Sequence, residues 1–271
     1  MENRKAGSLN TYLTKHAFVP KQIPETPAED LGIVVVIPCF NEPDILRILS
    51  SLKNCDSPKC SVEIVIVFNC PEDASILVKQ TNQKRSEEAR NFSKEHGRKH
   101  FQIHTIVADQ LPTKHAGVGL ARKIGMDEAV RRFDLTENHL GLILNVDADC
   151  TVATNYLSEI LDGFAKNEKI NAASIRYEHM LSGPEPQEVY KAIVLYELYL
   201  RYYIRGLRFA NYPFAFQTLG SCMVVRSSTY QQQGGMNKRK AGEDFYFLHK
   251  IMPLGGFVEI NSTCVYPSPR V

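Results

Sequence analysis

Apolar runs of strand length alternate with longer segments of helical spacing along most of the chain, and this alternation limits the folds that the sequence can adopt. The apolar runs lie at 32–38, 62–69, 101–109, 140–147, 172–177, 221–226 and 257–265. The helical segments between them lie at 44–53, 73–94, 118–133, 155–166, 187–207 and 243–252. Because the runs are rich in Val and Ile at successive positions, both faces of each strand are expected to be buried. The pattern predicts an α/β fold with a single mixed, mostly parallel sheet flanked by helices.

The beginning of the chain differs from the rest. Residues 1–30 carry Pro20, Pro24 and Pro27 among polar residues and show little periodicity, so they are predicted to form an N-terminal extension. The core is expected to open at about Leu31. With 271 residues in total and a hydrophobic content of 44%, residues 31–271 can form one large domain.

The net charge limits the classes of binding partner, and the cysteine content indicates the cellular compartment. The formal net charge is +2, which is too small to indicate nucleic acid as the main partner. The seven cysteines include no C-x-x-C pair and favour reduced thiols. The N-terminus has no signal-peptide core, and no window has the length and hydrophobicity of a membrane span. We therefore expect a cytoplasmic protein.

The run from Leu140 to Asp149 ends in two carboxylates, Asp147 and Asp149, separated by one residue. In sheets of this kind, ligands bind beyond the carboxyl ends of the strands. Paired carboxylates at such an edge can hold a divalent cation against a phosphate group. An EF-hand is excluded, because Val152 and Ser158 stand where that loop needs a glycine and an acid. Two alternatives stay open: Asp149 caps a helix, or Asp147 is the nucleophile of a haloacid-dehalogenase-like phosphohydrolase with the motif D-x-D-x-T-V.

Two earlier segments also combine a turn with the start of a helix. In the first, the strand Val34 to Ile37 is followed by Pro38-Cys39-Phe40-Asn41-Glu42, where Asn41 or Asp44 can also serve simply as a helix cap. In the second, Gly117 and Gly119 precede a helix, but Arg122 occupies the place of the third glycine of a G-x-G-x-x-G loop. A dinucleotide site is therefore not expected. Lys114 and Arg122 are instead candidates to reach a phosphate, the alternative being that both solvate a helix face.

A later segment helps to decide between a site that holds a divalent cation against a phosphate and a phosphohydrolase. The strand that begins at Gly220-Ser221 is followed by Glu243-Asp244 at the start of a helix. Taken alone, this acidic pair can be explained by the helix dipole. A phosphohydrolase of the rival kind needs its late acidic pair at the end of an apolar strand, whereas Lys238-Arg239-Lys240 precedes the pair here.

In this order, the motifs Ile37 to Glu42, Ala121-Arg122, Asp147 to Asp149, Gly220-Ser221 and Glu243-Asp244 resemble the family 2 glycosyltransferases of the GT-A fold, over about residues 31–265. The resemblance implies transfer of a sugar from a nucleotide-diphosphate sugar, with a UDP-sugar favoured, to an acceptor hydroxyl with inversion. Asp149, and Asp147 directly or through water, would position Mn or Mg on the diphosphate. Asp244, with Glu243 beside it, would be the general base. The positions that would contact the nucleotide sugar are Pro38, Phe40, Asn41, Glu42, Asn69, Lys114, Arg122, Asp147 and Gly220.

The chain departs from the family pattern in two places. Asn69 stands near the end of the second strand, where the family commonly has a carboxylate that contacts the nucleotide base. No Q-x-x-R-W motif follows Asp244, so transfer of a single sugar is expected and processive synthesis is not. A non-catalytic module that only binds a nucleotide sugar is a further alternative.

The segment 187–216 is rich in tyrosine and phenylalanine and lies between the proposed metal and base residues. Arg201, Arg205 and Arg208 form one stripe of its predicted helix, suited to an anionic lipid-linked acceptor or to peripheral contact with the inner face of a membrane. The alternative is a solvated stripe. A second stripe is expected to face the core: Val189, Ile193, Leu200, Ile204 and Leu207. The expected acceptor is a glycan or a lipid-linked molecule.

Overall fold

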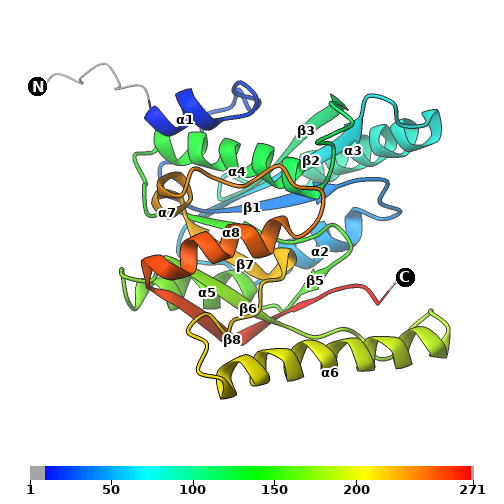
Figure 1. Ribbon diagram of the computed structural model, residues 1–271. Coiled ribbons are helices and arrows are strands. Elements are labelled where there is room, and N and C mark those ends of the chain that lie inside the picture. The colour runs from blue at the N-terminus through cyan, green and yellow to red at the C-terminus, as the bar shows by residue number, and fades with distance from the viewer. Residues whose placement is uncertain (1–9, 270–271) are drawn as a thin grey trace, which may run out of the picture.

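One mixed sheet of eight strands forms the centre of the computed structural model, which describes residues 10–269 (Figure 1). The strand order is β3-β2-β1-β4-β7-β6-β8-β5. The strands are β1 (Leu31–Cys39), β2 (Ser61–Pro71), β3 (Phe101–Leu111), β4 (Leu142–Asn145), β5 (Thr151–Val152), β6 (Ala172–Tyr177), β7 (Met223–Arg226) and β8 (Phe257–Tyr266). Strands β1 to β4 pair in parallel, whereas β7 is antiparallel to both β4 and β6. The predicted α/β class with a mixed sheet is confirmed.

Helices cover both faces of this sheet (Figure 1). One face packs against α2 (Leu46–Lys53), α3 (Ile76–His96) and α5 (Tyr156–Ala165). The other packs against α1 (Thr11–His16), α4 (Val118–Leu135), α7 (Ser227–Gln232) and α8 (Glu243–Ile251). The long helix α6 (Gln187–Phe209) lies at the periphery, beside β6 and β8, and two short 3₁₀ helices occupy Gly220–Cys222 and Met252–Leu254.

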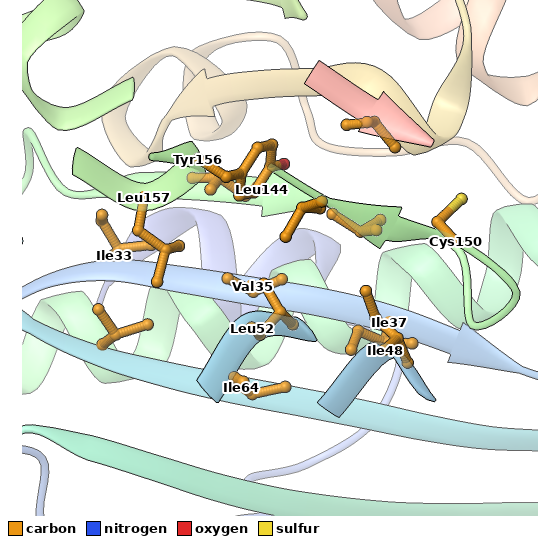
Figure 2. Close-up of a cluster of buried hydrophobic side chains, with 14 of the residues drawn as sticks. Ile33, Val35, Ile37, Ile48, Leu52, Ile64, Leu144, Cys150, Tyr156 and Leu157 are labelled. Atoms are coloured by element: carbon orange, nitrogen blue, oxygen red, sulfur yellow. The ribbon is translucent and has the colours of Figure 1, made fainter. Parts of the chain in front are cut away.

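The two-sided burial of the strands follows from their sequence. In β1, Ile33, Val35 and Ile37 point into one core, and Val34 and Val36 point into the other. All five side chains are fully buried. Figure 2 shows the first core, in which residues of β1 meet Ile48 and Leu52 of α2 and Tyr156 and Leu157 of α5. Continuous runs of Val and Ile are the expected composition for a strand with helices on both sides.

Each predicted strand and helix has a counterpart in the structure, with boundaries that differ by a few residues. The sequence did not indicate α1, α7 or the two-residue strand β5. These elements are too short to show a period of their own. Strand β5 forms because Thr151 and Val152 pair with Tyr266 and Val265 of β8, which are more than a hundred residues away in sequence.

Residues 10–30 lie against α4 and are fixed there by buried acids. The Tyr12 hydroxyl donates to Asp127 at 2.6 Å, and the backbone N–H of Ile23 donates to Glu128 at 3.1 Å. Both carboxylates are fully buried, so these bonds satisfy charges that would otherwise be costly. Strand β1 begins at Leu31, where the sequence predicted the core to open. No helix within residues 10–269 is long and apolar enough to cross a membrane.

The contact between Tyr12 and Asp127 generates a first prediction. Tyr12→Phe should lower the free energy of unfolding by about 1–3 kcal/mol, because a buried carboxylate loses a hydrogen-bond donor. Urea denaturation measures this. The control is Tyr202→Phe, whose side chain is 78% exposed and whose replacement should change stability by less than about 0.5 kcal/mol. Equal stability of the two variants would contradict a stabilising contribution from the hydrogen bond between Tyr12 and Asp127.

Candidate active site

A cavity of about 470 Å³ opens at the carboxyl edge of β1, β2 and β4, next to the first turn of α4. This is the edge at which open α/β sheets bind their ligands. Among the described residues, the lining side chains and backbone come from Pro38, Phe40, Glu42, Asn69, Pro71, Ala116, Gly117, Val118, Asp147, Ala148, Asp149 and Lys240. Six of the residues proposed from the sequence therefore meet in one place: Pro38, Phe40, Glu42, Asn69, Asp147 and Asp149.

One asparagine of α3 joins the loops that follow β1 and β2. Asn82 accepts a hydrogen bond from the backbone N–H of Asn41 at 2.9 Å and donates one to the carbonyl of Asn69, also at 2.9 Å. Asn41 itself has a positive φ of 50° and is not among the residues that line the cavity in the described chain. Asp44 accepts from the N–H groups of Leu46 and Arg47, so the helix-cap interpretation holds for Asp44. Asn82 was missed from the sequence, where only its low helix propensity inside a helix could have drawn attention to it.

Arg122 lies beneath the cavity and joins two carboxylates. Its guanidinium donates to Asp147 at 2.6 Å and to Glu243, and its side chain is 3% exposed. Desolvation lowers the pKa of this guanidinium, but the nearby carboxylates, of which Asp147 contributes most, hold that pKa above its ordinary value. Arg122 is therefore a buried cation that fixes carboxylates, and it is not part of the cavity lining among the residues described.

Gly220 packs against this guanidinium and contacts Asp244. A Cβ atom at Gly220 would lie 2.3 Å from a terminal nitrogen of Arg122, so only glycine leaves room for the buried cation. The backbone N–H of Gly220 donates to Asp244 at 2.8 Å, and the N–H of Phe245 donates to the other oxygen of Asp244 at 2.7 Å. Asp244 is partly exposed at the first turn of α8, whereas Glu243 is buried. The carboxylate of Asp244 is thus held in one orientation next to the Arg122 network.

The donor set at Asp147 and Asp149 fits a divalent cation bound together with a phosphate ligand. Both residues line the cavity and offer hard oxygen atoms, and Arg122 contacts one oxygen of Asp147. Within residues 10–269 there is no group of three or more His, Cys, Asp or Glu side chains arranged to hold a metal by themselves. Mg²⁺ and similar ions are commonly bound by one or two carboxylates, with phosphate and water completing the shell. Asp147 and Asp149 match the arrangement in which two carboxylates bind the ion and phosphate and water complete the shell.

Lys240 is the charged residue of the described cavity lining that was not proposed from the sequence. It lies in the segment between α7 and α8, and its backbone packs closely over Gly117, where an added Cβ would come within 3.1 Å of the Lys240 Cα. Among the described lining residues it is the one cation, facing a cavity that also contains Glu42, Asp147 and Asp149. The basic run 238–240 was the available signal. Lys114, the cation that was proposed instead, is exposed in the turn before α4 and outside this lining.

Solved structures with a similar fold include structures of TarS from S. aureus. A structure of TarS residues 1–349 aligns with a TM-score of 0.54 and 17% identity, over 88% of this chain and 60% of that one. The same portion in complex with UDP-GlcNAc aligns with a TM-score of 0.56 and 17% identity, over 89% of this chain and 59% of that one. The chain therefore spans less than two thirds of the TarS portion that it resembles. At this identity the likeness shows the fold, which is GT-A-like.

The sequence itself places the chain in a family. No curated protein sequence is similar enough to the chain to count as a relative. Residues 34–231, however, match the family described as glycosyl transferase family 2, and this range includes the cavity residues of β1, β2 and β4. Because the match extends over most of the chain and agrees with the fold, the chain belongs to glycosyl transferase family 2.

Proposed function

We propose that the protein transfers a single sugar, with inversion, from a UDP-sugar to an acceptor hydroxyl in a metal-dependent reaction. The observation that carries this proposal is the arrangement around Arg122. Asp147 and Asp149 line the cavity, and Asp147 contacts the guanidinium. Asp244 is held by Gly220, which packs against the same guanidinium. Family membership supports sugar transfer, and the TarS complex with UDP-GlcNAc supports a uridine diphosphate donor.

Each group has a distinct part in this mechanism. Asp147 and Asp149 would hold Mn or Mg, which supplies positive charge to the departing diphosphate when it is bound. Lys240, which lines the same cavity, would contact the diphosphate, and Asn69 would contact the base. Asp244 would accept the proton of the acceptor hydroxyl as the new glycosidic bond forms and the bond to the diphosphate breaks. Glu243 would position Arg122 and stay outside the chemistry.

The alternative functions have less support. A phosphohydrolase needs Asp147 as a nucleophile, but this carboxylate is paired with Arg122, and the family match is to glycosyltransferases.

A cytoplasmic location is consistent with the cysteines, none of which forms a disulfide.

The role of Asp244 as base can be tested by one substitution. Asp244→Asn should lower turnover by about 10²- to 10⁴-fold, because the amide cannot accept the proton, whereas it can still accept the N–H of Gly220. UDP release from UDP-GlcNAc and other UDP-sugars, with a panel of glycan acceptors, measures turnover, and calorimetry measures UDP affinity. Asp162→Asn, an exposed acid on α5, is the control. Wild-type turnover in Asp244→Asn would exclude Asp244 as the base, and a wild type that binds UDP-sugars without turnover would favour the non-catalytic module.

The proposed metal site can be tested through UDP binding, without a measurement of turnover. Mn should strengthen UDP binding to the wild type, and Asp149→Ala should abolish this enhancement, because one of the two carboxylate ligands is lost. Calorimetric titration of UDP with and without Mn tests it, with Asp162→Ala as the control. If Mn enhances UDP binding to Asp149→Ala as much as to the wild type, Asp149 is not a metal ligand.

Lys240 should act on the diphosphate and leave the nucleoside unaffected. A hydrogen bond to a charged group contributes roughly 1.5–3 kcal/mol, so Lys240→Ala should weaken UDP binding by about 10- to 100-fold and leave uridine binding unchanged. Competition binding with the two ligands separates these effects. Lys238→Ala is the matched control from the same segment, since the Lys238 ammonium lies over the ring of Phe18. Equal losses for UDP and uridine would contradict a specific contact between Lys240 and phosphate.

A further inference from the structure

The outward face of α6 is apolar and aromatic, which is unusual for a helix at the periphery. Five large side chains share this face and are between 58% and 92% exposed: Leu195, Leu198, Tyr199, Tyr202 and Phe209. Their spacing of three, four and seven residues places them on one side of the helix. Ile204, 7% exposed, lies on the opposite side, and Figure 1 shows no other element beyond α6. A continuous exposed surface of this kind marks an interaction site.

The helix differs in this respect from the sequence prediction. The stripe expected to face the core is only partly buried, with Ile204 as its one fully buried member among Val189, Ile193, Leu200, Ile204 and Leu207. The helix lies alongside β6 and β8 and does not cover the sheet, so it contacts the rest of the protein through a narrow strip. Most of the side chains around the helix are therefore exposed and could contact another molecule.

Arginines line one flank of the same helix. Arg201, Arg205 and Arg208 border a cavity of about 260 Å³, together with Arg176 of β6. Arg201 pairs with Glu197 and Arg208 pairs with Glu259, each at 2.7 Å. Arg205 forms no ion pair with any residue between 10 and 269. The flank therefore presents one cation without an acidic partner, Arg205, between two arginines whose charges are offset by acids, next to an apolar face. A basic flank beside an apolar face is the pattern of a helix that lies in the interface of an anionic membrane.

Another cavity lies between this helix and α8, the helix that carries the proposed base. It has a volume of about 350 Å³ and is lined by Tyr203 and Leu207 of α6 and by Phe245 and His249 of α8. Phe245 directly follows Asp244, and the lining also includes Leu219, which precedes Gly220. The lining therefore includes sequence neighbours of both Asp244 and Gly220, which places this apolar, aromatic cavity close to the proposed base.

We propose that the outward face of α6 rests on an anionic lipid bilayer and that a lipid-linked acceptor reaches Asp244 from that side. The occupant is identified by charge complementarity, because the exposed Leu and Tyr side chains match the acyl and headgroup boundary while Arg205, which has no acidic partner among the described residues, matches a lipid phosphate. At 23 residues, α6 would extend about 35 Å along the surface. The position of the acceptor rests on the function proposed above, whereas the docking of α6 does not.

Sedimentation with vesicles tests the docking without donor, metal or acceptor. The wild type should sediment with vesicles of phosphatidylcholine mixed with phosphatidylglycerol, and far less with phosphatidylcholine alone. Arg205→Glu should weaken binding to anionic vesicles by at least roughly fivefold, the contribution of one basic residue near such a surface. This variant breaks no ion pair, so its fold should be retained, which circular dichroism checks. Reversal of charge at Arg201, Arg205 and Arg208 together should abolish binding.

The apolar face has its own variant and its own control. Leu198→Ser with Tyr202→Ser should reduce sedimentation with both kinds of vesicle. Ile76→Ser with Leu77→Ser, an equally exposed apolar pair on α3, should not. The proposal is overturned if the wild type stays in solution with anionic vesicles, if the α6 variants bind as well as the wild type, or if light scattering shows a dimer that Leu198→Ser with Tyr202→Ser dissociates. Normal UDP binding alongside absent vesicle binding would reject the docking and leave the proposed function standing.

Discussion

The buried guanidinium of Arg122 connects the parts of the site that the chain supplies from distant positions. It joins Asp147, just beyond β4, to Glu243 at the first turn of α8. Removing a guanidinium from water is costly, and here the cost is offset by direct contact with two carboxylates. Loss of Arg122 would leave the buried carboxylate of Glu243 without its partner, and loss of either acid would leave the buried guanidinium with only one. The network therefore specifies one position for α8 relative to β4, and with it one position for the side chains next to the network.

The neighbours of this network carry the proposed chemistry. Asp147 and Asp149 face the cavity from the end of β4, and Asp244 follows Glu243 in sequence. Gly220 contributes in two ways: it lacks the Cβ that would displace Arg122, and its N–H orients Asp244. The Arg122 ion pairs thus position Asp147, one of the groups proposed to hold the leaving group, and Glu243, the residue directly before the proposed base. This preorganisation is the usual source of catalytic electrostatics, because little reorientation is needed during the reaction.

Helix α4, which carries Arg122, is fixed from its outer side as well. Its acids Asp127 and Glu128 accept hydrogen bonds from residues between 12 and 23, and Arg132 pairs with Glu63 of β2 at 2.6 Å. These charges are buried and satisfied, so they restrict the helix to one rotation about its axis. Residues 10–30, predicted only as an extension, therefore contribute to the orientation of the helix on which the site depends.

The sequence alone determined the layers of the fold and the edge at which the site forms, because runs of Val and Ile such as β1 fit only strands covered on both faces, and parallel strands end at one edge. It also identified Asp147 and Asp149 as acids at the end of a strand, and Asp244 as an acid at the start of a helix. Only the tertiary structure decided that Arg122 binds carboxylates and lies outside the cavity, that Lys240 faces the cavity while Lys114 does not, and that the aromatic face of α6 points outward. Arg122 and Glu243 are 121 residues apart. Local periodicity predicts which side of an element is apolar, but which surface covers that side, and which charges meet, depends on contacts between segments far apart in the chain.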